Sequence, residues 1–402
     1  MLTSLAFVFL VGLAAAAWCQ AAGLPRIVGM LLAGILLGPY ALNWLDPKIL
    51  SVSADLRQLA LVIILIKAGL SLNLGDLKQV GRPALLMTCL PATFEILAYT
   101  LLAPAIFGVS WIEGAVMGAV LGAVSPAVVV PRMVNLIETG WGTEKSIPQM
   151  ILAGASMDDI YVIVLFSTFS GMAQGGRPKI SDFAGIPVSI LLGIAVGLAA
   201  GQLMARFFEA CFVRQAHIRN SMKVILILGT AFLLLAVEGW LEEYVPFSGI
   251  LAVTAMACGL RLKCPAPVSA RLSQKFGKLW LAAEVVLFVL VGAAVDIRYT
   301  LEAGGKAVVI IFAALAVRAL GVLLATAGTA LNRKERLFCV IAYLPKATVQ
   351  AAIGSVPLAM GLPCGKLVLS VAVAAILITA PLGALGMDRT YQRLLERAPA
   401  DT

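Results

Sequence analysis

Residues 122–131 read GAVSPAVVVP, an apolar stretch that holds two prolines, Pro126 and Pro131. Proline removes an amide donor and clashes with the preceding turn, so a helix through this stretch should break and leave backbone groups without helical partners. Residues 342–350, AYLPKATVQ, place Pro345 in a second apolar segment. The meaning of these breaks depends on whether the surrounding chain lies in water or in lipid.

The composition places the chain in a membrane. Of its 402 residues, 61% are hydrophobic and 13% are charged, and the mean hydropathy is +1.00, which water-soluble domains do not approach. The net charge of +9 comes from basic residues in short loops, which favours the positive-inside rule over nucleic-acid binding. The seven scattered cysteines show neither metal-ligand spacing nor a disulfide framework.

Hydropathy and loop charges predict an all-α polytopic membrane protein with about 13 transmembrane helices. About two thirds of the 30 Lys and Arg residues lie on the side that bears the C-terminus, so we expect the N-terminus outside and a short cytoplasmic tail at 389–402. The expected spans are roughly 1–22, 26–43, 56–72, 84–107, 113–137, 147–171, 183–206, 221–239, 247–262, 277–295, 304–331, 336–358 and 365–387.

Glycine and proline landmarks predict an internal repeat within one transporter unit, 1–402. A nearly constant offset relates a first repeat at 1–171 to a second at 221–388, with a linker helix at 183–206. Corresponding spans cross the membrane in opposite directions, and matched broken helices point to an ion site at the midplane. The alternatives are simple proline kinks and chance similarity. The pairs, offset by 219 to 223 residues, are Pro25 and Pro246, Gly38 and Gly259, Gly69 and Gly292, and Pro126 and Pro345.

Charged residues inside the spans are the candidate functional groups. Asp158 and Asp159 begin an apolar run, where an ionised carboxylate needs a partner or water. Adjacent helical residues point about 100° apart, so one carboxylate should coordinate a hard cation while the other faces a fixed base. Burial and a like charge favour the protonated carboxyl, so a proton and a cation compete for the same oxygens. The other charges in the spans are Glu95, Glu284, Arg318, Lys346 and Lys67, of which Lys67 can snorkel and Glu284 reads as a structural carboxyl.

Three motifs carry a resemblance to a known family. GAVSPAVVVP, ASMDDI (155–160) and LPKATVQAAIG (344–354) resemble the monovalent cation/proton antiporter superfamily. They are closest to the two-aspartate sodium/proton antiporter branch that includes the animal solute-carrier family nine subfamily B proteins. The resemblance implies the sodium/proton antiporter fold with crossed discontinuous helices, a homodimer with a dimerisation domain, and a core domain, mainly 84–171 and 304–388, that moves by elevator-type alternating access.

The resemblance also implies roles for single residues. Asp159 would be the principal ion and proton ligand, with Asp158 beside it as a second ligand of the transported Na⁺ or Li⁺. Ser125, at the first break, is assigned to the same site. No catalytic residue, resident metal or cofactor is expected. The charge-compensating residues would be Arg318, Lys346 and Glu95. The helix breaks are expected at Pro126, Pro131 and Pro345.

The predicted function is therefore exchange of Na⁺ or Li⁺ for H⁺ in a bacterial plasma (inner) membrane, serving pH homeostasis, and not an enzyme activity. A K⁺/H⁺ antiporter of the same superfamily and a cation channel are the alternatives. An intramembrane aspartyl protease is disfavoured because its two aspartates face each other from different helices. Many two-aspartate relatives carry lysine where this chain has Arg318, which cannot release a proton, so we hypothesise electroneutral exchange. The expected partners are the cation and proton, the lipid bilayer and a second copy of the chain, with no nucleic acid.

Overall fold

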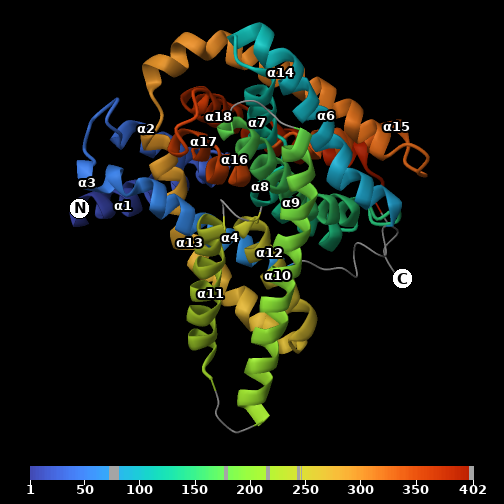
Figure 1. Ribbon diagram of the computed structural model, residues 1–402. Helices are drawn as coiled ribbons and strands as arrows, with labels where there is room; N and C mark the ends of the chain where they lie inside the picture. Colours follow the sequence, from blue (N-terminus) through green and yellow to red (C-terminus); the bar gives the residue numbers. More distant parts are fainter. Residues whose placement is uncertain (72–80, 176–179, 214–217, 242–244, 246, 398–402) are drawn as a thin grey trace. The chain divides into compact units, whose positions relative to one another are not determined.

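The computed structural model describes residues 1–71, 81–175, 180–213, 218–241, 245 and 247–397 (Figure 1). In these residues the chain is helical, with one isolated β-bridge between Trp141 and Arg397. Nine helices of this described part are long and apolar enough to cross a membrane, and shorter apolar helices span Arg26–Leu37 and Thr348–Ala359. The predicted all-α polytopic class is confirmed, while the count of about 13 spans stays a prediction.

The chain divides into two compact units, and unit 1 comprises Met1–Ala54, Asn73–Ala173 and Val285–Thr402. Within it, α6 packs along α14 and against α7, and α18 contacts both α7 and α16 (Figure 1). Its helices are α1 (Leu2–Ala21), α2 (Arg26–Leu37), α3 (Pro47–Ser51), α6 (Arg82–Phe107), α7 (Trp111–Leu121), α8 (Pro126–Glu138), α9 (Ile147–Gln174), the end of α13 (Ala266–Ala293), α14 (Ile297–Ala325), α15 (Arg333–Ala342), α16 (Thr348–Ile353), α17 (Val356–Ala359) and α18 (Gly365–Leu394).

Unit 2 comprises Asp55–Leu72 and Gln174–Glu284. The backbones of α10 and α12 touch, because a Cβ at Gly197 would lie 2.2 Å from a carbonyl oxygen of α12 and one at Gly201 2.3 Å from another. Lys67 lies 5.8 Å from the ring centre of Trp280, so its ammonium rests on an aromatic face. The helices of unit 2 are α4 (Ser53–Ser71), α10 (Ile180–Val213), α11 (Asn220–Leu241), α12 (Gly249–Lys263) and the first part of α13.

Two helix crossings in the units correspond to one another under the sequence offset. In unit 1, α2 and α13 cross where a Cβ at Gly34 or Gly292 would lie 2.0 or 2.3 Å from a carbonyl of the facing helix. In unit 2, α4 and α12 cross at Gly69, whose Cβ would lie 2.8 Å from a carbonyl of α12. Only glycine permits such close backbone approach. The correspondence supports the inverted repeat, which stays a prediction.

Several helices run beyond the expected spans. The expected bounds counted apolar residues alone, whereas α10 extends to Val213, α13 begins at Ala266 and α18 continues to Leu394. Basic residues such as Arg271 and Arg393 lie in these extensions, as expected for helix ends outside the hydrocarbon. Part of the tail expected at 389–402 is therefore the last turns of α18.

The end of α18 is fastened to the segment between α8 and α9. Arg132 makes a bidentate ion pair with Asp388, both N–O distances being 2.9 Å. The amide of Gly142 donates to the carbonyl of Glu396 at 2.7 Å, next to the bridge between Trp141 and Arg397. We call these contacts of residues 388–397 with residues 132–142 the C-terminal clasp. The clasp joins the second half of one broken helix to the last helix of the chain.

Lys145 extends the clasp region to α15. Its Nζ lies 2.8 and 3.0 Å from the two carboxylate oxygens of Glu335, which is 1% exposed and also caps α15. The hydrogen bond to Glu335 and the nearby carboxylate charges raise the pKa of Lys145. A lysine whose pKa is raised in the folded protein contributes its full stabilisation at pH values below the ordinary lysine pKa. That stabilisation is lost as the pH rises through the raised pKa.

We therefore expect Lys145→Met to lower the melting temperature of the detergent-solubilised protein, because the buried carboxylate of Glu335 loses its base. The loss should be constant from about pH 6 to about pH 9, which lies below the ordinary lysine pKa of about 10.4. Thermal unfolding of wild type and variant across that range measures it. The exposed Lys48→Met is the matched control, and a Lys145 effect that disappears by pH 8 would contradict the assignment.

Candidate functional site

Both broken spans are interrupted in unit 1 by a few non-helical residues. In the first span, α7 ends at Leu121 and α8 begins at Pro126. Proline suits the first position of a helix, because the amide there has no partner within the helix. In the second span, α15 ends at Ala342 and α16 begins at Thr348, with Pro345 in the non-helical residues between them. The amide of Ser125 donates to the carbonyl of Pro345 at 2.8 Å, so the two breaks are joined backbone to backbone.

The expectation of a further break at Pro131 is wrong. Helix α8 runs from Pro126 to Glu138 with Pro131 inside it. Pro131 costs the helix a single hydrogen bond to the carbonyl four residues earlier. The span is non-helical at Gly122–Ser125, directly before Pro126, and this is its one break.

Five charged side chains are buried in unit 1, close to the breaks. Glu95 on α6 accepts through Oε2 from Arg318 Nη1 and from Lys346 Nζ, each at 2.5 Å. Asp158 and Asp159 come from α9. None of the five is more than 7% exposed. A buried carboxylate that accepts from two cationic donors forms an ion-pair network with them, and the loss of one member leaves the others without a partner.

Arg318 on α14 is the centre of this network. Its Nη2 lies 3.4 Å from Asp158 Oδ2, its Nε donates to the carbonyl of Tyr343 at 2.9 Å, and its Nη1 donates to the carbonyl of Gly122. The two carbonyls lie at the two breaks, where no helical amide is present to bond them. The planar guanidinium therefore satisfies backbone oxygens and carboxylates together, which a lysine ammonium could not do with the same geometry.

Close helix packing brings Arg318 to Glu95. Gly321 lies one turn after Arg318, and a Cβ there would be 2.8 Å from the carbonyl of Leu90 on α6. The backbones of α14 and α6 consequently touch at this point. A larger residue at 321 would push the guanidinium away from Glu95.

The two aspartates differ in their surroundings. Asp158 is fully buried, and its Oδ2 accepts from the amide of Val124 at 2.8 Å in addition to facing Arg318. The Oδ1 atoms of both aspartates are buried without a hydrogen-bond partner among the described residues, but no ion pair within that part of the chain includes Asp159. One carboxylate is thus held by a base and a backbone amide, and its neighbour is left for another ligand.

Several further buried side-chain oxygens have no hydrogen-bond partner among the described residues, and three of them belong to neutral residues at the breaks. These three are Ser125 Oγ, Thr348 Oγ1 and Tyr343 Oη, all at or beside the breaks. Ser125 was predicted, whereas Thr348 and Tyr343 were missed, because neutral polar residues are common in membrane helices and give no distinctive pattern. The part of the chain that the structure describes holds no group of three or more His, Cys, Asp or Glu side chains that could hold a metal ion. A cation here would need hydroxyl, backbone or water oxygens besides carboxylate.

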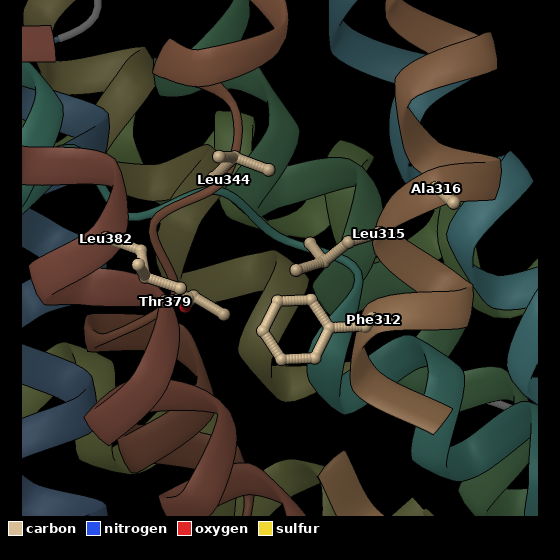
Figure 2. Close-up of a pocket in the computed structure, with 6 residues that line it drawn as sticks. All are labelled: Phe312, Leu315, Ala316, Leu344, Thr379 and Leu382. Atoms are coloured by element: carbon tan, nitrogen blue, oxygen red, sulfur yellow. The ribbon is translucent and has the colours of Figure 1, made fainter. Parts of the chain in front are cut away.

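A cavity of about 310 Å³ lies beside the second break (Figure 2). Among the described residues that line it, Thr379 alone has a polar side chain, and its Oγ1 accepts from the amide of Lys346 at 2.9 Å. The described lining residues include no carboxylate, so they do not suit a cation. Its lining residues are Phe312, Leu315 and Ala316 of α14, Leu344 of the break, and Thr379 and Leu382 of α18.

Comparison with known proteins supplies an independent finding. The family model described as sodium/hydrogen exchanger, transmembrane, matches residues 5–388. Mouse sodium/hydrogen exchanger 9B2 is 35% identical over 388 residues, covering 93% of this chain and 69% of that protein. Human sodium/hydrogen exchanger 9B1 is 32% identical, covering 93% and 73%. The solved sodium proton antiporter MjNhaP1 from Methanocaldococcus jannaschii at pH 8 superimposes with a TM-score of 0.83 over 98% of both chains at 20% identity, which establishes similarity of fold.

Proposed function

The chain belongs to the sodium/hydrogen exchanger family, and from this premise we propose that it exchanges Na⁺ or Li⁺ for H⁺ at Asp159. It is an integral multi-pass membrane protein, and a transporter rather than an enzyme, as its exchanger relatives are. The observation that carries the proposal is the contrast between the two aspartates. Asp158 faces Arg318, while Asp159 is buried without an ion-pair partner among the described residues.

The charges of the network support a single exchangeable cation. With Glu95, Asp158 and Asp159 ionised, the buried cluster holds three carboxylates and two bases, Arg318 and Lys346. One negative charge is left over, and either H⁺ or Na⁺ bound at Asp159 would neutralise it. Moving a neutral site across an apolar barrier costs far less than moving a charged one. Competition for one carboxylate then couples the two flows in opposite directions.

We propose that alternating access moves the network as one body, in the elevator manner. The expected core segments, 84–171 and 304–388, both lie within unit 1. The ion pairs of Glu95 and Arg318 and the hydrogen bond between the breaks tie α6, α9, α14 and both breaks together. The homodimer, the outside N-terminus, the cytoplasmic C-terminus and the bacterial plasma membrane stay predictions, and the animal relatives do not bear on that membrane.

Purified protein in proteoliposomes tests the function. A pH gradient, acid inside, is reported by a fluorescent pH dye, and Na⁺, Li⁺ or K⁺ is then added outside. We expect Na⁺ and Li⁺ to collapse the gradient with a saturable rate, and Asp159→Asn liposomes to hold it. A response to K⁺ alone would favour the K⁺/H⁺ alternative. Cation flux without proton flux, rising with voltage and not saturating, would indicate a channel and overturn the proposal.

Exchange is expected to be electroneutral, because Arg318 keeps its charge throughout the cycle and one H⁺ replaces one Na⁺. Moving one net charge through about 100 mV would change the driving force by about 2.3 kcal/mol. The initial rate of Na⁺-driven proton release should therefore be the same at zero and at about −100 mV, set with potassium and valinomycin. A strong dependence on the imposed potential would contradict one-for-one exchange.

A further inference from the structure

Gln350 on α16 is fully buried and connects the two breaks, although no charge marks it. Its Oε1 accepts from the amide of Ala347 at 2.8 Å, which satisfies a free donor at the start of α16. The backbone amide of Ala347 can pair only with an oxygen, so it fixes which end of the Gln350 side chain faces it. Nε2 of Gln350 must then face the other break. There it donates to the carbonyl of Ala123 at 2.8 Å and approaches that of Leu121 at 3.5 Å.

The carbonyl of Ala123 belongs to the same peptide group as the amide of Val124. At one end of this peptide group, Gln350 Nε2 and Lys346 Nζ donate to the oxygen, the latter at 3.2 Å. At the other end, the N–H donates to Asp158 Oδ2 at 2.8 Å. Donors on the oxygen polarise the peptide group and strengthen its N–H as a donor. They also fix the plane of a peptide that no helix holds.

We propose that Gln350 is a positioning residue for ion exchange, acting on Asp158 through the Ala123–Val124 peptide group. By fixing that peptide, Gln350 keeps Asp158 turned toward Val124 and Arg318, and thereby leaves Asp159 as the carboxylate available to the transported ion. This role rests on the proposed exchange at Asp159. Gln350 itself touches neither the ion nor the proton.

Gln350→Glu separates this role from simple capping of α16. A glutamate keeps an acceptor for the Ala347 amide, so a cap-only role is preserved at every pH. As a protonated acid it also keeps a donor for the Ala123 carbonyl, whereas as a carboxylate it has none and would draw Lys346 away from Glu95. The other charged groups of the surrounding network are Arg318, Asp158 and Asp159.

We expect Gln350→Glu to exchange at close to the wild-type rate in acid and to lose about tenfold as pH rises, a loss comparable to that of one or two buried hydrogen bonds. Gln350→Met, similar in size but without donor or acceptor, should show the reduced rate at every pH. Initial rates at saturating Na⁺, and the Na⁺ concentration for half-maximal rate, are measured in proteoliposomes over the pH range. Gln149→Met is the matched control, a glutamine of α9 outside the network, and should follow wild type.

The outcomes are distinguishable. A Gln350→Glu profile parallel to that of wild type assigns the residue to capping alone and overturns the proposal. So does a Gln350→Met protein that exchanges normally. If Gln350→Met does not fold, the profile of Gln350→Glu decides alone. Absence of exchange in wild type would refute the proposed function instead.

Discussion

Asp159→Asn is expected to abolish exchange, lowering the rate of Na⁺-driven proton release by at least about 100-fold, to the level of empty liposomes. Asparagine has nearly the shape of aspartate but neither accepts a proton nor carries the charge that Na⁺ would neutralise. Since Asp159 has no ion-pair partner in the described part of the chain, the change removes a buried charge and breaks no salt bridge. The variant should fold normally and melt no lower than wild type.

Asp158→Asn is the matched comparison. Asp158 Oδ2 accepts from Val124 and faces Arg318, so its replacement leaves part of the positive charge of Arg318 without a partner. We expect this variant to melt below wild type, in contrast to Asp159→Asn. Thermal unfolding in detergent and exchange in liposomes are measured on the same preparations. Retained exchange in Asp159→Asn would remove the proposed ion site, and equal melting temperatures for the two variants would remove the distinction between the aspartates.

Glu95→Gln is expected to destabilise the protein by about 3 kcal/mol or more, because both Arg318 and Lys346 lose a buried carboxylate. It should also weaken Na⁺ binding. The network then holds two acids and two bases, so no negative charge is left for the cation. Thermal unfolding with and without Na⁺ measures both effects, since a bound ion raises the melting temperature of the folded state.

A second substitution tests whether charge balance is the cause. In Glu95→Gln with Lys346→Met, one acid and one base are removed together, and the excess of one negative charge returns. We expect the double variant to recover part of the stability and the Na⁺-dependent rise in melting temperature. If the double variant is no better than Glu95→Gln alone, the loss comes from packing or hydrogen bonding, and the charge count does not govern ion binding.

The charged members of the site could be predicted from the sequence, because charge is rare at membrane depth. Asp158, Asp159 and Arg318 stand out in apolar runs, and Pro126 and Pro345 mark the breaks by removing amide donors. What the pattern could not supply was the pairing across the fold. Arg318 serves Glu95 and the Gly122 carbonyl besides Asp158, and these contacts join residues that are far apart in the chain.

Other features had no signal in side-chain chemistry. Gln350 and Thr348 are neutral polar residues in an apolar segment, where most such residues have no special role. The Ala123 carbonyl is a backbone atom that any residue would provide, and its importance follows from the missing helical turn. A proline by itself predicts a break, but Pro131 lies inside α8, and a helix tolerates one lost hydrogen bond once it has restarted at Pro126.

The hydrogen bond from the Ser125 amide to the Pro345 carbonyl limits how the site could change shape. Each break is the other's backbone partner, and a shift of one alone would strand an amide and a carbonyl in a medium that offers no replacement. The two non-helical breaks therefore hold each other in place. This hydrogen bond is consistent with the proposed elevator movement, in which the binding centre is displaced with its internal distances preserved.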